Sequence, residues 1–120
     1  MQKRPLFTET VKATAAISAN RFVTYAGKQA ETAGELVMGV SDTAIEAGGY
    51  VGVDVIGTTI VDVGGTFSKG DDLAADTDGK AVKATAGQNV CARALYDAAA
   101  GQKTEVLLIQ QAAATAPSGG

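Results

Sequence analysis

Glycines divide this sequence into short segments in which apolar and polar residues alternate, and this pattern limits the possible folds more than any other feature. Valines alternate along residues 51–55, and they do so again along residues 61–63, after Gly57. Similar segments occupy residues 10–15, 21–25, 36–40, 90–95 and 104–109. Many short strands with Gly-rich turns predict an all-β fold, a small antiparallel β-barrel or sandwich.

One turn is specified by local chemistry. Asp78-Gly79 stands between residues 73–75 and residues 80–84, and Asp-Gly favours the turns whose twist matches that of a β-hairpin. Residues 92–100 are rich in alanine and are compatible with a helical turn or two, or equally with a strand and a loop. The sequence therefore predicts at most one short helix.

The length of 120 residues supports a single domain. Residues 1–8 contain Pro5 and lack periodicity, so we expect an extended N-terminal arm. Residues 9–110 form the predicted β domain. Residues 111–120 are mostly small and are expected to form a flexible C-terminal tail.

Composition argues against several functional classes. The chain has no histidine, which removes the commonest general base, the commonest metal ligand and every Ser-His or Cys-His pair. The net charge of -3 disfavours nucleic-acid binding, which needs a basic surface. Apolar runs are too short to span a membrane, and the N-terminus lacks the pattern of a signal peptide. We expect a protein made in the cytoplasm, without enzymatic activity, cofactor or metal, and with Cys91 as a buried core residue.

The acidic residues do not form a recognised motif. The stretch 71–79 resembles part of a calcium loop, but Ala74 and Thr85 occupy two positions that need oxygen ligands, so a solvated turn with Asx-type bonding is expected. Asp54, Asp62 and Glu105 alternate with apolar residues. That spacing predicts that all three carboxylates lie on the exposed face of a half-covered sheet.

Taken together, the segments resemble a known family of virion proteins. The resemblance rests on RFV at 21–23, GV at 39–40, GYVGV at 49–53, Gly57, VGGTFSKGD at 63–71, DTDGKA at 76–81, ARAL at 92–95, AAAG at 98–101 and VLLI at 106–109. Over residues 7–110 the chain is similar to the capsid-cement, or head-decoration, proteins of tailed phages.

This resemblance implies a compact β domain that assembles as a homotrimer on the exterior of a phage capsid. There it would contact the major capsid protein and stabilise the expanded head. A location in the virion follows from the same resemblance, with synthesis in the host cytoplasm.

Three parts of the chain are candidate capsid or trimer contacts. Arg4, Pro5, Leu6 and Phe7 in the arm could add a strand to the edge of a capsid sheet. Phe67, in a glycine-flanked loop, is predicted to be held by a neighbouring chain. Arg93 is predicted to lie at a subunit or capsid contact, with a surface pairing to an acid such as Asp97 as the alternative.

Two other functional classes remain open. A glycan- or host-surface-binding β module would need an exposed aromatic platform, and the chain has no tryptophan. A biotinyl- or lipoyl-like carrier domain would modify Lys80, because DTDGKA resembles a carrier turn, although Gly79 stands directly before the lysine. Such a modification would raise the intact mass of the protein.

Overall fold

The computed structural model describes residues 3–109 of the chain. Within that range every regular element is a β-strand, and there is no helix. The strands are β1 (Pro5–Lys12), β2 (Phe22–Val23), β3 (Gly39–Ser41), β4 (Tyr50–Asp62), β5 (Asp72–Ala75), β6 (Ala81–Lys83), β7 (Ala92–Ala94) and β8 (Lys103–Leu108). The all-β prediction is confirmed, and residues 92–100 form a strand and a loop.

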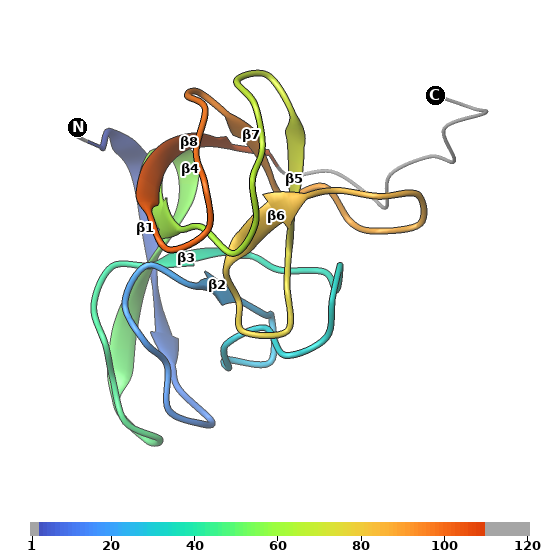
Figure 1. Cartoon of the computed structure of the whole chain (residues 1–120). Coiled ribbons are helices and arrows are strands. Elements are labelled where there is room, and N and C mark those ends of the chain that lie inside the picture. Colours follow the sequence, from blue (N-terminus) through green and yellow to red (C-terminus); the bar gives the residue numbers. More distant parts are fainter. Residues whose placement is uncertain (1–2, 110–120) are drawn as a thin grey trace.

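Two sheets share strand β4. In the first sheet β4 lies between β1 and β3, and β2 pairs with β3. In the second sheet the strand order is β4-β8-β7-β5-β6. All of these strand pairs are antiparallel. Figure 1 shows β1 and β4 running side by side on the side of the molecule opposite the β5–β6 hairpin.

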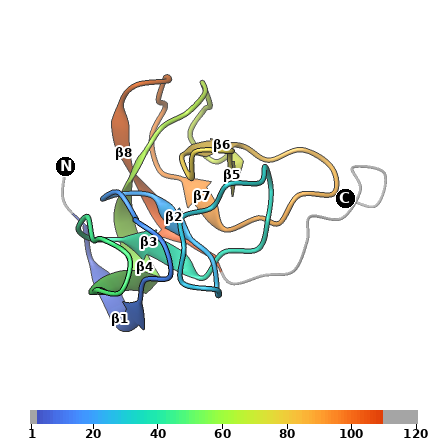
Figure 2. The same cartoon turned by 90° about the horizontal axis from the view of Figure 1, so that it is seen from below.

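The second sheet curls until its two ends meet. Val63, directly after β4, forms a β-bridge with Ala81 at the start of β6. The amide of Gly64 donates a hydrogen bond of 2.8 Å to the Ala81 carbonyl. The strands therefore form a nearly closed barrel, which pairs backbone groups that an open sheet would leave at its edges. In Figure 2 the barrel strands β5, β6 and β7 lie on the side of the molecule away from β1.

Gly57 bends β4 without ending it. The sequence suggests two strands separated by this glycine, whereas the structure has one strand of 13 residues. Gly57 has a φ of +101°, and a Cβ atom there would clash with the main-chain oxygen of Arg4. Glycine is therefore required at the point where β4 passes from one sheet to the other.

Small aliphatic side chains fill two separate clusters. The barrel core consists of Phe22, Ala30, Val37, Val40, Val61, Val63, Phe67, Leu73, Ala75, Ala81, Cys91, Ala92, Ala94, Ala98, Val106 and Leu108. The second cluster consists of Ala13, Ile17, Val23, Val51 and Val53, with Val11, Met38, Ile45 and Val55 partly buried against it. The second cluster lies under the first sheet and has far less apolar material.

The predicted hairpin is confirmed in detail. Strands β5 and β6 pair with Ala75 opposite Ala81. Between them, Asp76 Oδ1 accepts hydrogen bonds from the amides of Asp78 at 2.8 Å and Lys80 at 2.9 Å. The acidic stretch thus forms the Asx-type turn that its composition indicates.

The N-terminal segment is extended, and its main chain is already paired. Residues 5–8 of the predicted arm lie in β1, where Pro5 is opposite Gly57 and Thr8 is opposite Asp54. The register shifts on both sides of Phe7, as in a β-bulge. The predicted C-terminal tail, residues 111–120, lies outside the described residues.

Phe67, predicted to be held by a neighbouring chain, is held by the core of its own chain in this structure. The residue is only 3% exposed and belongs to the barrel core of its own chain. Its loop forms a bridge with Ala98, with N–H···O distances of 3.0 and 3.1 Å, and this pairing directs the ring inward.

Replacing Phe67 with alanine should destabilise the isolated chain. Phe67→Ala removes a buried ring and leaves a cavity, so the free energy of unfolding should fall by about 3–5 kcal/mol. Guanidinium denaturation at a fixed protein concentration measures this change. Tyr96→Ala is the control, because Tyr96 is half exposed. A loss for Phe67→Ala no greater than that for the control would contradict the burial of Phe67.

Candidate functional site

Residues 3–109 contain no group of three or more side chains suited to hold a metal ion. Burial raises the pKa of the Cys91 thiol to about 12, so the residue remains a protonated core side chain. In the same range, no helix is long and apolar enough to cross a bilayer.

Asp54 is buried, contrary to the prediction that it lies on an exposed sheet face. It is 1% exposed. Its Oδ2 atom accepts hydrogen bonds from Lys3 Nζ at 2.9 Å and Thr59 Oγ1 at 2.7 Å, and its Oδ1 atom accepts one from Thr8 Oγ1 at 2.9 Å. Lys3, which precedes β1, and Thr8, within β1, supply two of the three donors, and the three hydrogen bonds offset the cost of burying the charge.

Glu105 is also covered, so the same prediction is wrong for this residue. Its Oε2 atom accepts a hydrogen bond of 2.7 Å from Thr58 Oγ1. Thr58 Oγ1 in turn accepts one of 2.8 Å from the amide of Arg4, and the amide of Thr58 donates to the Arg4 carbonyl at 3.1 Å. The hydrogen bonds around Asp54 and Glu105, here called the N-terminal latch, fix residues 3–8 against β4. Both carboxylates therefore accept hydrogen bonds that hold the fold together.

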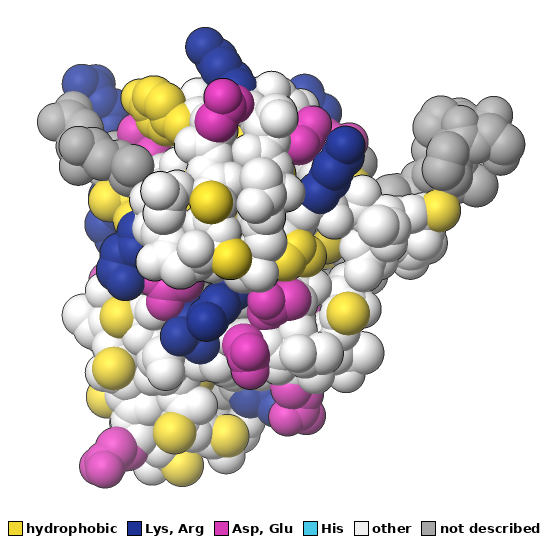
Figure 3. Space-filling view, in the orientation of Figure 1, with side chains coloured by type: hydrophobic (Ala, Val, Ile, Leu, Met, Phe, Trp, Pro, Cys, Tyr) yellow, Lys and Arg dark blue, Asp and Glu magenta, His cyan; other side chains and the backbone are white. Residues whose placement is uncertain are grey.

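Asp62, the third of these carboxylates, is partly exposed at the end of β4 and forms salt bridges with Arg21 and Lys103. Arg21 Nε and Lys103 Nζ each lie 2.8 Å from its carboxylate oxygens. Burial by itself would raise the pKa of Asp62, but the hydrogen bonds from Lys103 and Arg21 outweigh it and hold the pKa below its usual range. On the face in Figure 3, positive and negative side chains are interspersed and form no basic stripe.

Arg93 lies on the surface of the barrel. Its Nη2 and Nε atoms donate to Asp72 Oδ1 at 2.8 and 3.1 Å, across the pairing of β7 with β5. Asp97, the acid suggested by the sequence, instead accepts a hydrogen bond from the amide of Lys69 at 2.8 Å. The predicted subunit or capsid contact at Arg93 stays a prediction.

Strand β1 exposes its N-terminal residues. Leu6 is 79% exposed and Phe7 is 51% exposed. One edge of β1 pairs with β4. On its other edge, no backbone hydrogen bond from elsewhere in residues 3–109 reaches residues 6–11. The arm residues singled out in the sequence thus form an anchored edge strand with an unpaired side.

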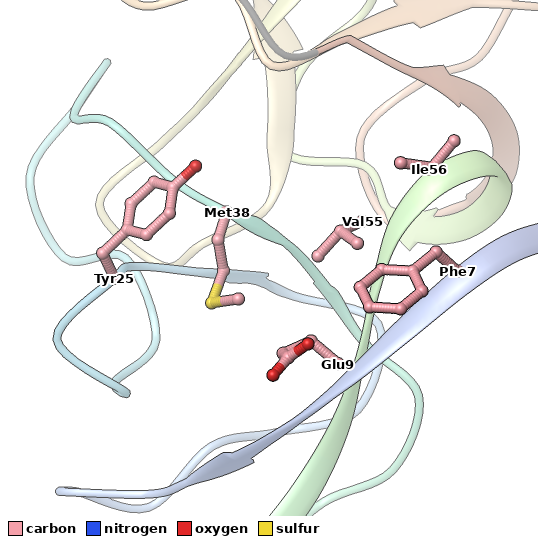
Figure 4. Close-up of a pocket in the computed structure, with 6 residues that line it drawn as sticks. All are labelled: Phe7, Glu9, Tyr25, Met38, Val55 and Ile56. Atoms are coloured by element: carbon pink, nitrogen blue, oxygen red, sulfur yellow. The ribbon is translucent and has the colours of Figure 1, made fainter.

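An apolar hollow opens beside this strand, with a volume of about 290 Å³. Figure 4 shows that its lining comes from β1, β4, the segment after β2 and the segment before β3. The lining residues are Phe7, Glu9, Tyr25, Met38, Val55 and Ile56. Sequence reasoning missed this hollow, because its lining comes from four segments that are far apart along the chain.

Most of the aromatic residues lie on the surface of the single chain. Only Phe22 and Phe67 are buried. Tyr25 is at the hollow, but Tyr50 and Tyr96 belong to other parts of the surface. The predicted carrier residue Lys80 is not at the tip of its hairpin, where the exposed residues are 77 and 78.

Removing one donor of the N-terminal latch should loosen β1. Thr8→Val keeps the shape of the side chain but removes the hydroxyl that donates to Asp54. A hydrogen bond to a charged group is worth about 1.5 kcal/mol or more, so β1 amides should exchange with solvent roughly tenfold faster. Thr10→Val on the same strand is the matched control. Equal exchange rates in the two variants would show that the latch does not hold β1.

The ion pairs of Asp62 should make stability depend on pH. Because the folded-state pKa lies below the unfolded one, ionised Asp62 stabilises the fold above the unfolded pKa, and this contribution is lost as pH falls through the folded pKa. The stability difference between wild type and Asp62→Asn should therefore shrink from about pH 6 to about pH 2. Urea denaturation measures it, with the exposed Asp78→Asn as control. A difference that stays constant over this range would contradict the pKa shift.

The fold and the sequence are similar to those of phage head proteins. The chain superposes on the head fiber gp8.5 N base of bacteriophage phi29 with a TM-score of 0.70, over 86% of this chain and 93% of that chain, at 20% identity. This likeness shows a shared fold. No curated protein matches the chain significantly in sequence. The sequence model of the phage cement proteins matches residues 1–110, which include all eight strands. The chain therefore belongs to the phage cement protein family, a family of structural virion proteins.

Proposed function

We propose that this protein binds the outer surface of a phage capsid as a homotrimer and stabilises the expanded head. The observation that carries the proposal is the family match over residues 1–110, which spans the barrel and the anchored N-terminal strand. Its partner on the capsid is the major capsid protein. Its role is structural, and it needs neither a cofactor nor direct contact with nucleic acid.

The N-terminal strand suits attachment to a shell. Its outer edge offers main-chain donors and acceptors to an extended segment of the major capsid protein, with little demand on sequence. The N-terminal latch holds the strand in place before binding, so less conformational entropy is lost in the complex. In a trimer three such edges act together, and weak single contacts add up through their high effective concentration.

The alternative functions have less support. Glycan binding needs polar groups around an aromatic surface, but the hollow offers one carboxylate among mainly apolar side chains. A carrier function needs an accessible lysine at a turn tip, and Lys80 instead lies where the hairpin returns to β6. An increase in intact mass at Lys80, or specific glycan binding without capsid binding, would favour these alternatives.

The capsid proposal is tested with heads of the phage that encodes this chain, prepared without the protein. Purified protein should cosediment with expanded heads to a saturating stoichiometry and bind unexpanded proheads less. Electron microscopy should place trimeric density on the outside of the shell, and decorated heads should retain DNA at higher temperature than bare heads. Absence of binding to expanded heads, or equal heat resistance with and without the protein, would overturn the proposal.

A further inference from the structure

The second cluster is left open at one side, and the apolar hollow is that opening. Met38 and Val55 are partly buried against the cluster and line the hollow. At its rim, Phe7 and Ile56 remain about half exposed. Figure 4 shows these side chains arranged around the hollow. Covering them would remove further apolar surface from water and would complete a cluster that one chain builds only in part.

Glu9 gives the hollow a charge. Its side chain is the one carboxylate among the six lining residues and lies on the same side of the hollow as Phe7 (Figure 4). Within residues 3–109 no hydrogen bond or salt bridge to the Glu9 side chain is found. An occupant that carries a cation beside an apolar side chain would therefore match the hollow in both shape and charge.

This chain presents such a combination itself. Leu6 is the most exposed of the large apolar side chains in the described part, and Arg4 stands two residues before it. The latch bonds the backbone of Arg4, through its amide and carbonyl, to Thr58. The Arg4 guanidinium is exposed and forms no salt bridge with any residue in the range 3–109. In an extended strand, residues two apart are separated by about 7 Å, a distance that a hollow of this size can span.

We infer that the apolar hollow is the contact between copies in the trimer, and that it receives Leu6 and Arg4 of a neighbouring copy, with Arg4 facing Glu9. This inference rests on the proposed trimer. The two halves of the contact are different surfaces of one chain, so each copy offers Arg4 and Leu6 to one neighbour and its hollow to the other. Such head-to-tail contacts close into a ring when the rotation between copies allows it.

Exchanging the two charges tests the contact. Arg4→Glu and Glu9→Arg each place like charges together, so each should weaken trimer association by about tenfold or more. The double variant Arg4→Glu/Glu9→Arg restores opposite charges across the contact and should restore the trimer. Leu6→Asp should also dissociate it. Analytical ultracentrifugation at a series of protein concentrations gives the association state, and circular dichroism confirms that each variant is folded.

Matched controls lie outside the hollow. Lys69→Glu reverses an exposed charge, and Leu36→Asp replaces a half-exposed leucine; both should leave the trimer intact. If wild type and both single charge variants are trimers, the hollow is not the contact, although the trimer stands. If the single variants dissociate and the double variant does too, Arg4 does not face Glu9 and the inference is overturned.

Binding to expanded heads separates this inference from the proposed function. A wild-type protein that is monomeric in solution and on heads would overturn the trimer and this contact, but would leave cementing intact. Charge rescue of the trimer without any binding to heads would support the contact and overturn the capsid role. Single variants that stay trimeric but lose head binding would show that the hollow receives a capsid segment, which also overturns the inference.

Discussion

Strand β4 is hydrogen-bonded in both sheets, and the rest of the structure depends on how it passes from one to the other. Its first half pairs with β1 and β3, and its second half pairs with β8. Gly57 provides the bend between the halves. Thr59 then reaches back across this bend to donate to Asp54 at 2.7 Å. The bend is thus fixed by a buried, charge-assisted hydrogen bond, and the relative position of the two clusters follows from it.

The N-terminal strand is held mainly by polar interactions. Nearly all of its side chains are exposed, so it buries little apolar surface against its own chain. Its position depends on the β4 ladder and on hydrogen bonds to Asp54 and Thr58, which are directional and fix its register. A strand attached in this way leaves the side chains of Leu6 and Phe7 exposed. The strand is thus anchored by its backbone and by polar hydrogen bonds, and its exposed apolar side chains are not needed to hold it in place.

Local chemistry in the sequence was enough to predict the β class and the Asp78-Gly79 hairpin. The burial of Asp54 was not predictable from spacing, because its donors Lys3 and Thr8 lie 51 and 46 residues away along the chain. Val53 and Asp54 are adjacent and both buried, which breaks the two-residue period where β4 has cover on both faces. The glycines around Phe67 indicated a loop, and pairing with Ala98 turns its ring into the core of the same chain. The candidate arm residues were identified from sequence, whereas the hollow beside them required the tertiary structure.

The pairing of β1 with β4 also has a consequence for synthesis. The ribosome releases β1 first, but its pairing partner follows only some 40 residues later. Closing so long a loop is entropically costly, so β1 joins the fold late, and until then the edge that pairs with β4 is unpaired. In a host cell producing many copies at once, a nascent chain can accept the first strand of a sister chain instead of its own. Strand swapping between newly made copies is therefore the characteristic misfolding risk of this architecture.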